Sequence, residues 1–299
     1  MATGYGKVIL LGEHAVVYGY PALASALPCG VTLEAAPGAL SVRVPSWELD
    51  VDVAASPAHP VARALVAVAG AVAARAAREL PAAALRGDAQ LWPAAGLGSS
   101  GALCVAIARA LAAAAQVELS DAEIAEVANR GEQIFHGSPS GLDVALAASG
   151  RAGVFRRGRG LTPVRLRPLT LVIGHSGEPR STARMVARVA EQTGGDPADA
   201  RLLALADATS RGVEAATTGA RADLGLAMRD AQRVLAELGV STPRLDALCT
   251  AAEGAGALGA KLTGAGGGGC AIALVADDAA PVVDAWQRLG ARTRVEVLG

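Results

Sequence analysis

Two glycine-rich segments constrain the fold of this chain more than any other feature. The first, Gly96–Gly101, runs directly into the alanine-rich segment 102–116, which is long enough for about four helical turns and poor in β-branched residues. The second, Gly264–Gly269, leads into the apolar run Cys270–Ala276, which has the length of a buried strand. The chain must therefore combine helices with sheets, and its 299 residues suffice for two domains.

Other segments fit this mixed architecture. The further runs that predict strands are Lys7–Leu11, Val31–Leu33, Leu40–Val44, Gln90–Trp92 and Leu169–Ile173. Helices are predicted over Val61–Leu80 and Asp121–Phe135, the second opened by a capping box of Ser120 and Glu123. A hairpin is expected over Gly150–Gly160, and two or three helices between Ser181 and Glu253. We place the domains at 1–165 and 166–299.

Charge and composition favour a small-molecule substrate. The formal net charge is -1, and no basic stripe interleaved with aromatic residues is present, so nucleic-acid binding is not expected. Arginines interrupt the alanine-rich stretches, and the N-terminus lacks a secretory pattern, so we expect no membrane span and a cytoplasmic protein. The four cysteines are widely separated, which argues against disulfides and structural zinc.

The segment Gly96–Gly101 has the properties of a phosphate site. Glycines let backbone N–H groups approach an anion, and the following helix supplies unpaired amides and the positive end of its dipole, next to the hydroxyls of Ser99 and Ser100. An ordinary serine-capped helix is the alternative. The segment also matches GxGxxG, but a dinucleotide site needs a second strand ending in an acid, whereas here Ser120 begins another helix.

A few charged residues are candidates for chemistry. The chain has only two lysines, Lys7 and Lys261, among 27 basic residues, so these positions are candidates for a compact point charge. Asp143 follows a turn-rich loop and could accept or orient a hydroxyl proton. Glu132 with Ser100 could ligate Mg²⁺. The alternatives are a helix cap for Asp143 and a solvated helix face for Glu132.

The four histidines are too dispersed for a metal site. His14, together with Glu13, ends the first apolar strand. His136 lies at the turn-rich loop before Asp143, and His175 begins the loop that follows the predicted strand Leu169–Ile173. His59, between two prolines, is interpreted as loop filler.

Taken together, the motifs resemble those of the GHMP kinases. The three segments that carry the resemblance are Gly6–Gly19, Gly96–Ser100 and Lys261–Cys270. Between them, Gly131–Asp143 is similar to the family's segment that carries a metal-binding Glu and the catalytic Asp. Within the superfamily, Gly12–Gly19 and His136–Asp143 resemble the mevalonate kinase family in particular.

The resemblance implies an α+β fold with two domains, the first similar to domain 2 of ribosomal protein S5 and the second ferredoxin-like. It implies that Asp143 is catalytic, that Lys7 stabilises the transferring phosphoryl group, and that Ser100 and Glu132 hold Mg²⁺. The residues expected to cradle ATP are Gly96, Leu97, Gly98, Ser99, Ser100 and Gly101. The residues expected to line the substrate pocket are Glu13, His14, His175, Ser176, Ser181 and Thr182.

The implied reaction is ATP-dependent phosphorylation of the C5 hydroxyl of mevalonate. The sequence does not decide whether the chain forms a homodimer. Three alternatives remain: a sister kinase acting on phosphomevalonate or a sugar, an NAD-binding oxidoreductase, and a non-catalytic nucleotide-binding relative. The chain departs from the family at Gly4–Gly6, at Trp92–Ala95 and at Arg184, which stands where a lysine is common.

Overall fold

A computed structural model describes residues 1–137 and 139–299 of the chain, and these form two compact units. The first unit holds residues 1–7, 26–93 and 98–150, and the second holds 8–25, 94–97 and 151–299. The strands β1 (Ala2–Leu11) and β2 (Ala22–Pro37) pass from one unit into the other. Each unit thus consists of several separate segments of the chain. The domain boundary at residue 165 stays a prediction.

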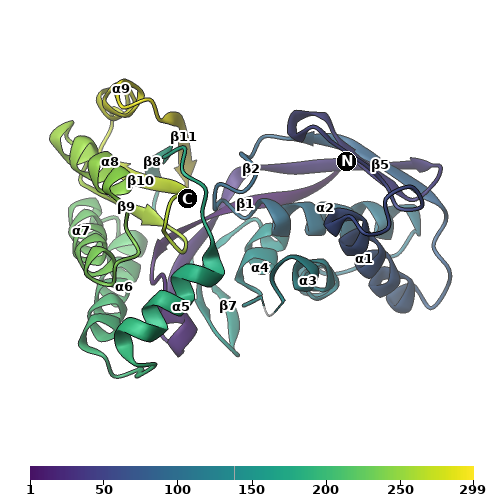
Figure 1. The fold of residues 1–299 in the computed structure, drawn as a ribbon, viewed down its shortest axis with the longest axis horizontal. Coiled ribbons are helices and arrows are strands. Elements are labelled where there is room, and N and C mark those ends of the chain that lie inside the picture. The colour runs from purple at the N-terminus through teal and green to yellow at the C-terminus, as the bar shows by residue number, and fades with distance from the viewer. Residues whose placement is uncertain (138) are drawn as a thin grey trace. The chain divides into compact units, whose positions relative to one another are not determined.

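The first unit places four helices on one face of its strands (Figure 1). The strands follow the order β4-β3-β5-β2, with β3 (Ser41–Val44), β4 (Leu49–Asp52) and β5 (Ala83–Ala89). β2 and β5 pair antiparallel, from Val31 opposite Ala89 to Pro37 opposite Ala83, whereas β3 and β5 are parallel. The helices are α1 (Pro60–Ala76), α2 (Ser99–Ala114), α3 (Asp121–His136) and α4 (Leu142–Ser149).

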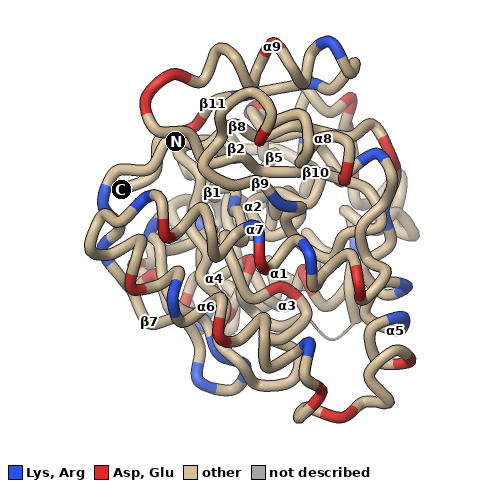
Figure 2. Tube along the Cα trace, turned by 90° about the vertical axis from the view of Figure 1, so that its left-hand side faces the viewer, with Lys and Arg blue, Asp and Glu red and all other residues tan. Residues whose placement is uncertain are grey.

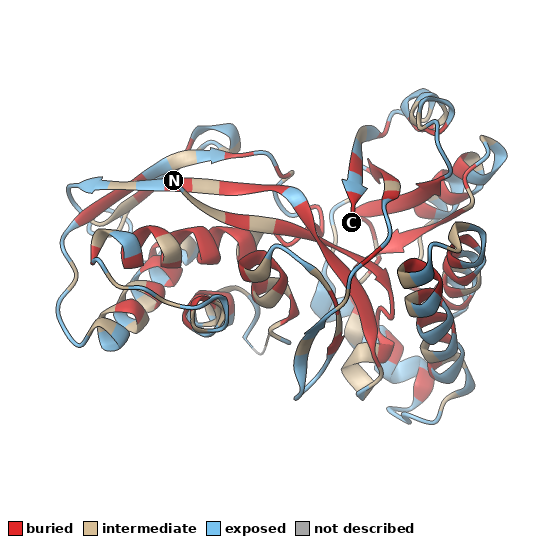
Figure 3. Cartoon of the chain, turned by 180° about the vertical axis from the view of Figure 1, so that it is seen from behind, coloured by how far each residue is buried: buried red, intermediate tan, exposed pale blue. Residues whose placement is uncertain are grey.

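Helix α2 forms the centre of this core. Its apolar residues from Ala102 to Ile107 are all buried, and Figure 3 shows the helix almost wholly buried beneath the strands. Alanine is the commonest residue of α1 and α2, and its small side chain allows neighbouring helices to approach closely. The low aromatic content, 3%, is thus compatible with a dense core.

The second unit contains an antiparallel sheet with the order β11-β8-β10-β9. Its strands are β8 (Leu169–His175), β9 (Gly259–Thr263), β10 (Cys270–Val275) and β11 (Arg292–Leu298). Counted along the chain this order is 4-1-3-2, which confirms the predicted ferredoxin-like arrangement. In the same unit, residues 22–25 of β2 pair with β6 (Ala152–Arg156), and β6 pairs with β7 (Gly160–Pro163) as the predicted hairpin.

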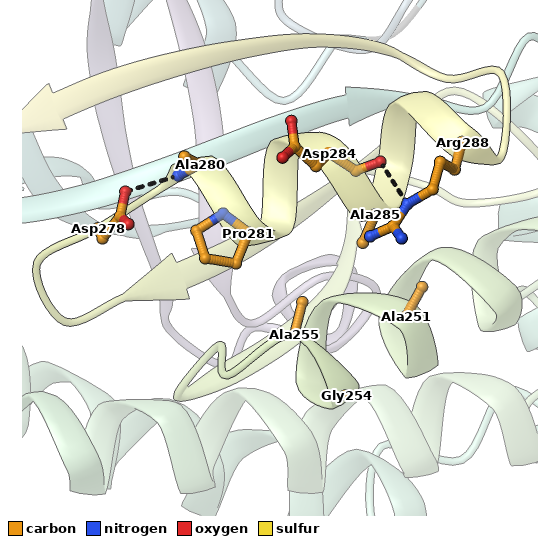
Figure 4. Close-up of a pocket in the computed structure, with 9 residues that line it drawn as sticks. All are labelled: Ala251, Gly254, Ala255, Asp278, Ala280, Pro281, Asp284, Ala285 and Arg288. Atoms are coloured by element: carbon orange, nitrogen blue, oxygen red, sulfur yellow. Dashed lines mark hydrogen bonds between the residues drawn. The ribbon is translucent and has the colours of Figure 1, made fainter.

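Five helices accompany this sheet: α5 (Thr182–Thr193), α6 (Ala200–Thr218), α7 (Arg221–Glu237), α8 (Pro243–Gly254) and α9 (Ala280–Arg288). Trp286 of α9 is fully buried against Gly174 of β8, and its indole N–H donates to the carbonyl of Leu248 at 2.7 Å. Figure 4 shows a shallow pocket between α8 and α9, lined by Asp278, Asp284 and Arg288 among small residues. None of the predicted site residues lines this pocket.

Several sequence predictions need correction. Gln90–Trp92 is not a strand, because the alanine-rich segment before it forms β5 instead. The segment 181–253 holds four helices rather than two or three, because Gly219 in the left-handed conformation ends α6. His59 is no loop filler: its Nδ1 accepts a hydrogen bond from the backbone N–H of Val61 at 3.2 Å and caps α1.

Residues of both charges are distributed along the trace (Figure 2). In the two described ranges, no helix combines the length and the apolar character that crossing a bilayer requires.

Candidate active site

The first candidate cluster lies at the beginning of α2, in the first unit. Gly98, with φ of 73°, precedes the helix, and Ser99 and Ser100 are its first two residues. A Cβ atom at Gly98 would lie 2.7 Å from Cγ of Lys7, so only glycine lets the lysine side chain cross here. Lys7 is 4% exposed, and its ammonium group is thereby held near the N-terminal turn of α2.

Lys7 forms an ion pair with Asp143. Its Nζ lies 3.4 Å from Oδ1 of Asp143, whose side chain is 30% exposed. Asp143 belongs to the first turn of α4, where Gly141 is the N-cap, so the aspartate is not itself the cap. The lysine is buried and the carboxylate still meets solvent, which leaves room for a reacting hydroxyl beside it.

Glu132 of α3 is buried and adjoins the same cluster. It is 2% exposed, and its Oε1 has no hydrogen-bond partner among the described residues, which excludes the solvated helix face. Burial, and then the negative charge of Asp143, raise the pKa of Glu132 to about 7, against a hydrogen bond from Ser100 and the charge of Lys7. His136 lies one turn later, with Nε2 3.2 Å from Oγ of Ser100 and 3.8 Å from Oε2 of Glu132.

Ser100 and Glu132 suit a magnesium ion that keeps most of its ligands from phosphate and water. A buried carboxylate oxygen without a partner is a feature that a cation would satisfy. Within the described parts of the chain, no group of three or more His, Cys, Asp or Glu side chains could hold a metal by itself. Whether Ser100 and Glu132 hold a metal stays a prediction.

The second cluster, in the second unit, joins the segment Gly6–Gly19 to the segment Lys261–Cys270. Glu13 and Lys261 form a buried ion pair, with side chains 1% and 0% exposed, and Nζ of Lys261 also donates to the carbonyl of Leu262 at 2.6 Å. Burial lowers the pKa of Lys261, and the charge of Glu13 opposes this shift. Thr263 of β9 contacts β1, because its hydroxyl accepts from the N–H of Ile9 and donates to that residue's carbonyl, both at 3.0 Å.

His14 is fixed to the third motif as well. It has φ of 61°, a conformation that few residues other than glycine adopt, and its Nε2 lies 2.9 Å from the carbonyl oxygen of Ala265. Burial lowers its pKa, with Lys261 acting in the same direction and the contact with Ala265 opposing. Neutral imidazole is thus favoured at this position. Whether Glu13 and His14 contact substrate stays a prediction.

The other predicted substrate residues lie at the end of β8 and the start of α5. The N–H of Ser176 donates to the carbonyl of Gly269 at 2.8 Å, and its hydroxyl accepts from the N–H of Glu178 at 3.2 Å. Nδ1 of His175 accepts from the N–H of Gly177 at 3.0 Å; burial, and then the charge of Arg292, lower the pKa of this imidazole. Exposed Ser181 caps α5, and exposed Thr182 begins it.

Sequence reasoning did not assign a role to Arg180. A Cβ atom at Gly96 would lie 3.0 Å from its Cζ, and one at Gly264 would lie 3.1 Å from its Nη1. The buried residues Gly96 and Leu97 thus lie next to the guanidinium group of Arg180. Gly264, in the segment Lys261–Cys270, leaves space for the same group. Arg184, which stands where the family's lysine is common, is exposed on α5. The sequence indicated that these glycines are important, but it did not indicate that the side chain of Arg180 packs against them.

The structure weakens the dinucleotide alternative. That alternative needs a strand after the helix that the glycine loop feeds, and α2 is followed by α3, which begins with the predicted capping box. Ser120 accepts from the N–H of Glu123 at 3.3 Å, and the carboxylate of Glu123 accepts from the N–H of Ser120 at 2.9 Å.

Comparison with known proteins gives consistent results. Residues 63–151 match the family model of the GHMP kinases N-terminal domain, and residues 213–292 match that of the GHMP kinases C-terminal domain. The chain is 36% identical to the mevalonate kinase of Aeropyrum pernix, over 91% of this chain and 87% of that protein. It is 33% identical to the mevalonate kinase of Archaeoglobus fulgidus, over 92% of each.

Solved structures share the fold. The crystal structure of L. major mevalonate kinase in complex with R-mevalonate has a TM-score of 0.83 and 28% identity, covering 99% of this chain and 94% of that one. The Streptococcus pneumoniae phosphomevalonate kinase in complex with phosphomevalonate and AMPPNP also has a TM-score of 0.83, at 20% identity and 99% of each chain. At this identity the second likeness concerns the fold alone.

Proposed function

Because this chain belongs to the GHMP kinases, and within them to the mevalonate kinases, we propose that it transfers the γ-phosphoryl group of ATP to the C5 hydroxyl of mevalonate. The products are 5-phosphomevalonate and ADP. The observation that carries this proposal is the ion pair of Lys7 and Asp143 at the beginning of α2, 3.4 Å across. In this pair the cation is buried, with a side chain 5% exposed, whereas the carboxylate still meets solvent, with a side chain 30% exposed.

In the proposed mechanism Asp143 holds the acceptor hydroxyl and takes or orients its proton. Lys7 stabilises the negative charge that develops on the attacking oxygen and on the transferring phosphoryl group. The N–H groups of Ser99, Ser100 and Gly101, at the N-terminus of α2, bind phosphate oxygens. Phosphoryl transfer needs mainly positioning and charge stabilisation, and these residues supply both.

Ser100 and Glu132 would hold a magnesium ion bound with the nucleotide, and that ion would supply positive charge at the phosphates. The protein's own contribution is to keep the hydroxyl of Ser100 beside Glu132 and His136. The carboxyl group of Glu132, whose pKa is raised to about 7, would hold the ion in its ionised form, whereas the hydroxyl of Ser100 would hold it as a neutral ligand.

For the substrate pocket we propose the residues at the ends of β1 and β8, namely Glu13, His14, His175 and Ser176, with Ser181 and Thr182 of α5. Glu13 acts through its buried pair with Lys261, which fixes the segment that carries His14. Arg180 adds a guanidinium group beside Gly96 and Gly264, and a guanidinium suits the carboxylate of mevalonate.

An acceptor panel tests the proposal. The full chain with ATP and Mg²⁺ is given mevalonate, phosphomevalonate or galactose, and ADP release is measured. We expect mevalonate to exceed the other acceptors in kcat/KM by about 100-fold or more. Equal or faster turnover of phosphomevalonate or a sugar would assign the chain to a sister kinase, and ATP binding without turnover of any acceptor would reject the enzyme assignment.

The variant Asp143→Asn tests the central residue. It keeps the size of the side chain and removes the negative charge, so we expect kcat to fall by about 10²- to 10⁴-fold. Binding of ATP, measured by calorimetry, should stay within about threefold, because the phosphates bind to α2. Wild-type turnover in this variant would remove Asp143 from the mechanism.

A further inference from the structure

The imidazole of His136 lies beside Ser100 and Glu132, the two residues proposed to hold the metal. His136 is the last residue of α3, and Gly137, with φ of 68°, ends the helix directly after it. Glu132 lies four residues earlier, so the two side chains extend from the same face of α3. The side chain of His136 is 46% exposed and that of Glu132 is 3% exposed, so the imidazole can turn toward a ligand without disturbing the core.

Three donor atoms converge beside the first turn of α2. Nε2 of His136 lies 3.2 Å from Oγ of Ser100 and 3.8 Å from Oε2 of Glu132. Ligand atoms about 2.1 Å from one ion are roughly 3.0 Å apart in an octahedral site and about 3.4 Å apart in a tetrahedral one. The observed separations are close to these values, so a small movement of the exposed imidazole brings all three atoms onto one cation.

The charges around these atoms favour a cation as well. The carboxyl groups of Glu132 and Asp143 act on each other, and the nearby ammonium group of Lys7 is already paired with Asp143. The second carboxyl oxygen of Glu132, Oε1, is buried and has no hydrogen-bond partner in the parts of the chain that the structure describes. A cation held by Glu132 would offset the cost of burying its negative charge.

We propose that His136 is a third protein ligand of the nucleotide-bound metal, and that its nitrogen makes the site bind Co²⁺ in preference to Mg²⁺. This inference rests on the proposed function, which places the metal at Ser100 and Glu132. Mg²⁺ prefers oxygen ligands, whereas imidazole nitrogen suits first-row transition metals, Co²⁺ more than Mn²⁺. His136 thus determines which metal the site selects, while the phosphates and water supply the remaining ligands.

Pulsed electron paramagnetic resonance tests the ligand directly. The full chain is loaded with Mn²⁺ and the non-hydrolysable ATP analogue AMPPCP, which has no nitrogen in its phosphate bridge, in a buffer free of nitrogen. We expect the Mn²⁺ spin to couple to an imidazole nitrogen in the wild type and to lose this coupling in His136→Asn. His59→Asn is the matched control, because His59 caps α1 and asparagine also caps helices well.

Metal preference provides a second test. Calorimetry compares the dissociation constants of the Mg²⁺ and Co²⁺ complexes of AMPPCP for the wild type, His136→Asn and His59→Asn. Removing the imidazole should weaken binding of the Co²⁺ complex about tenfold or more, and that of the Mg²⁺ complex by less than about threefold. His59→Asn should bind both complexes as the wild type does.

A histidine that only positions Ser100 through their hydrogen bond would give different results. His136→Asn would then weaken both metal complexes by the same factor, and the wild type would show no nitrogen coupling. Either finding overturns the proposal. Both would leave the kinase function standing, because phosphoryl transfer with Mg²⁺ needs no nitrogen ligand, and the acceptor panel with Mg²⁺ tests that function separately.

Discussion

At the scale of single residues, the first cluster places one lysine against two carboxyl groups. Asp143 pairs with Lys7, whereas Glu132 is buried with one oxygen that has no partner in the described structure. The second carboxyl group is therefore costly to ionise, and its pKa of about 7 expresses that cost. Without a cation, and at a pH between about 4.5 and 7, Glu132 keeps its proton in the folded chain and loses it in the unfolded chain.

This proton has a measurable effect on stability. The pKa of Glu132 is about 7 in the folded chain against an ordinary 4.5, so the folded state binds more protons between these values. The free energy of unfolding should then fall as pH rises from about 4.5 to 7, by up to about 3 kcal/mol from this group. Denaturant unfolding without Mg²⁺ should show this fall in the wild type relative to Glu132→Gln. Parallel pH curves for the two proteins would contradict the shift.

The buried pair of Glu13 and Lys261 leads to a second prediction at this scale. Lys261→Met leaves the Glu13 carboxylate buried without its cation, which typically costs about 3–5 kcal/mol of unfolding free energy. Adding Glu13→Gln removes the stranded charge, so the double variant should recover a large part of the loss. Additive effects of the two substitutions would show that the residues do not interact.

At the scale of elements, α1, α2 and α3 meet at Gly131. A Cβ atom there would lie 2.5 Å from Sγ of Cys104 on α2 and 3.0 Å from Cγ2 of Val68 on α1. This close approach allows Glu132, the next residue, to reach the beginning of α2. The packing of the three helices thus helps to place the predicted metal ligand.

Gly131→Ala should therefore destabilise the chain by about 1–3 kcal/mol through overpacking, despite the better helix propensity of alanine. Cys104→Ala removes the sulfur that the new methyl group would meet. In that background we expect Gly131→Ala to be about neutral or stabilising, because the propensity gain remains. Urea unfolding of the four proteins of this cycle measures the coupling, and a coupling near zero would place the strain elsewhere.

The same scale shows what could be predicted from the sequence. Local signals were reliable: the Ser120–Glu123 capping box starts α3, and the glycine loop starts α2. Strand β5 was missed because its alanines are common in helices, and it is a strand only through its pairing with β2 and β3. The motifs named Lys7, Asp143 and Glu132, but the contact of Arg180 with Gly96 arises from segments far apart in sequence.

At the scale of the whole molecule, the second unit needs the beginning of the chain. Residues 8–25 belong to it, and they supply the carboxylate that pairs with Lys261 and the backbone groups that bind Thr263. A fragment of residues 151–299 lacks both. A division of the chain at any point between residues 13 and 261, such as the predicted one at 165, places these partners in different segments.

We therefore expect the fragment 151–299 to be unstable alone and to gain cooperative thermal unfolding when a peptide of residues 1–25 is added. Lys261 supplies the reason, because it would be fully buried without its counter-ion. Calorimetry of the fragment with and without peptide is the measurement, with a Glu13→Gln peptide as the control. A fragment that melts like the intact chain would refute this dependence.

The pairing of Glu13 with Lys261 spans 248 residues of sequence, and this separation has a consequence in time. At ordinary rates of protein synthesis, roughly 12–50 s pass between the emergence of the first residue and that of its partner. During that interval Glu13 and Ile9 lack their partners Lys261 and Thr263, while all of 26–150 has already been made. Until Lys261 emerges, the carboxylate of Glu13 has no cation to be buried against, so this part of the core forms only late in synthesis.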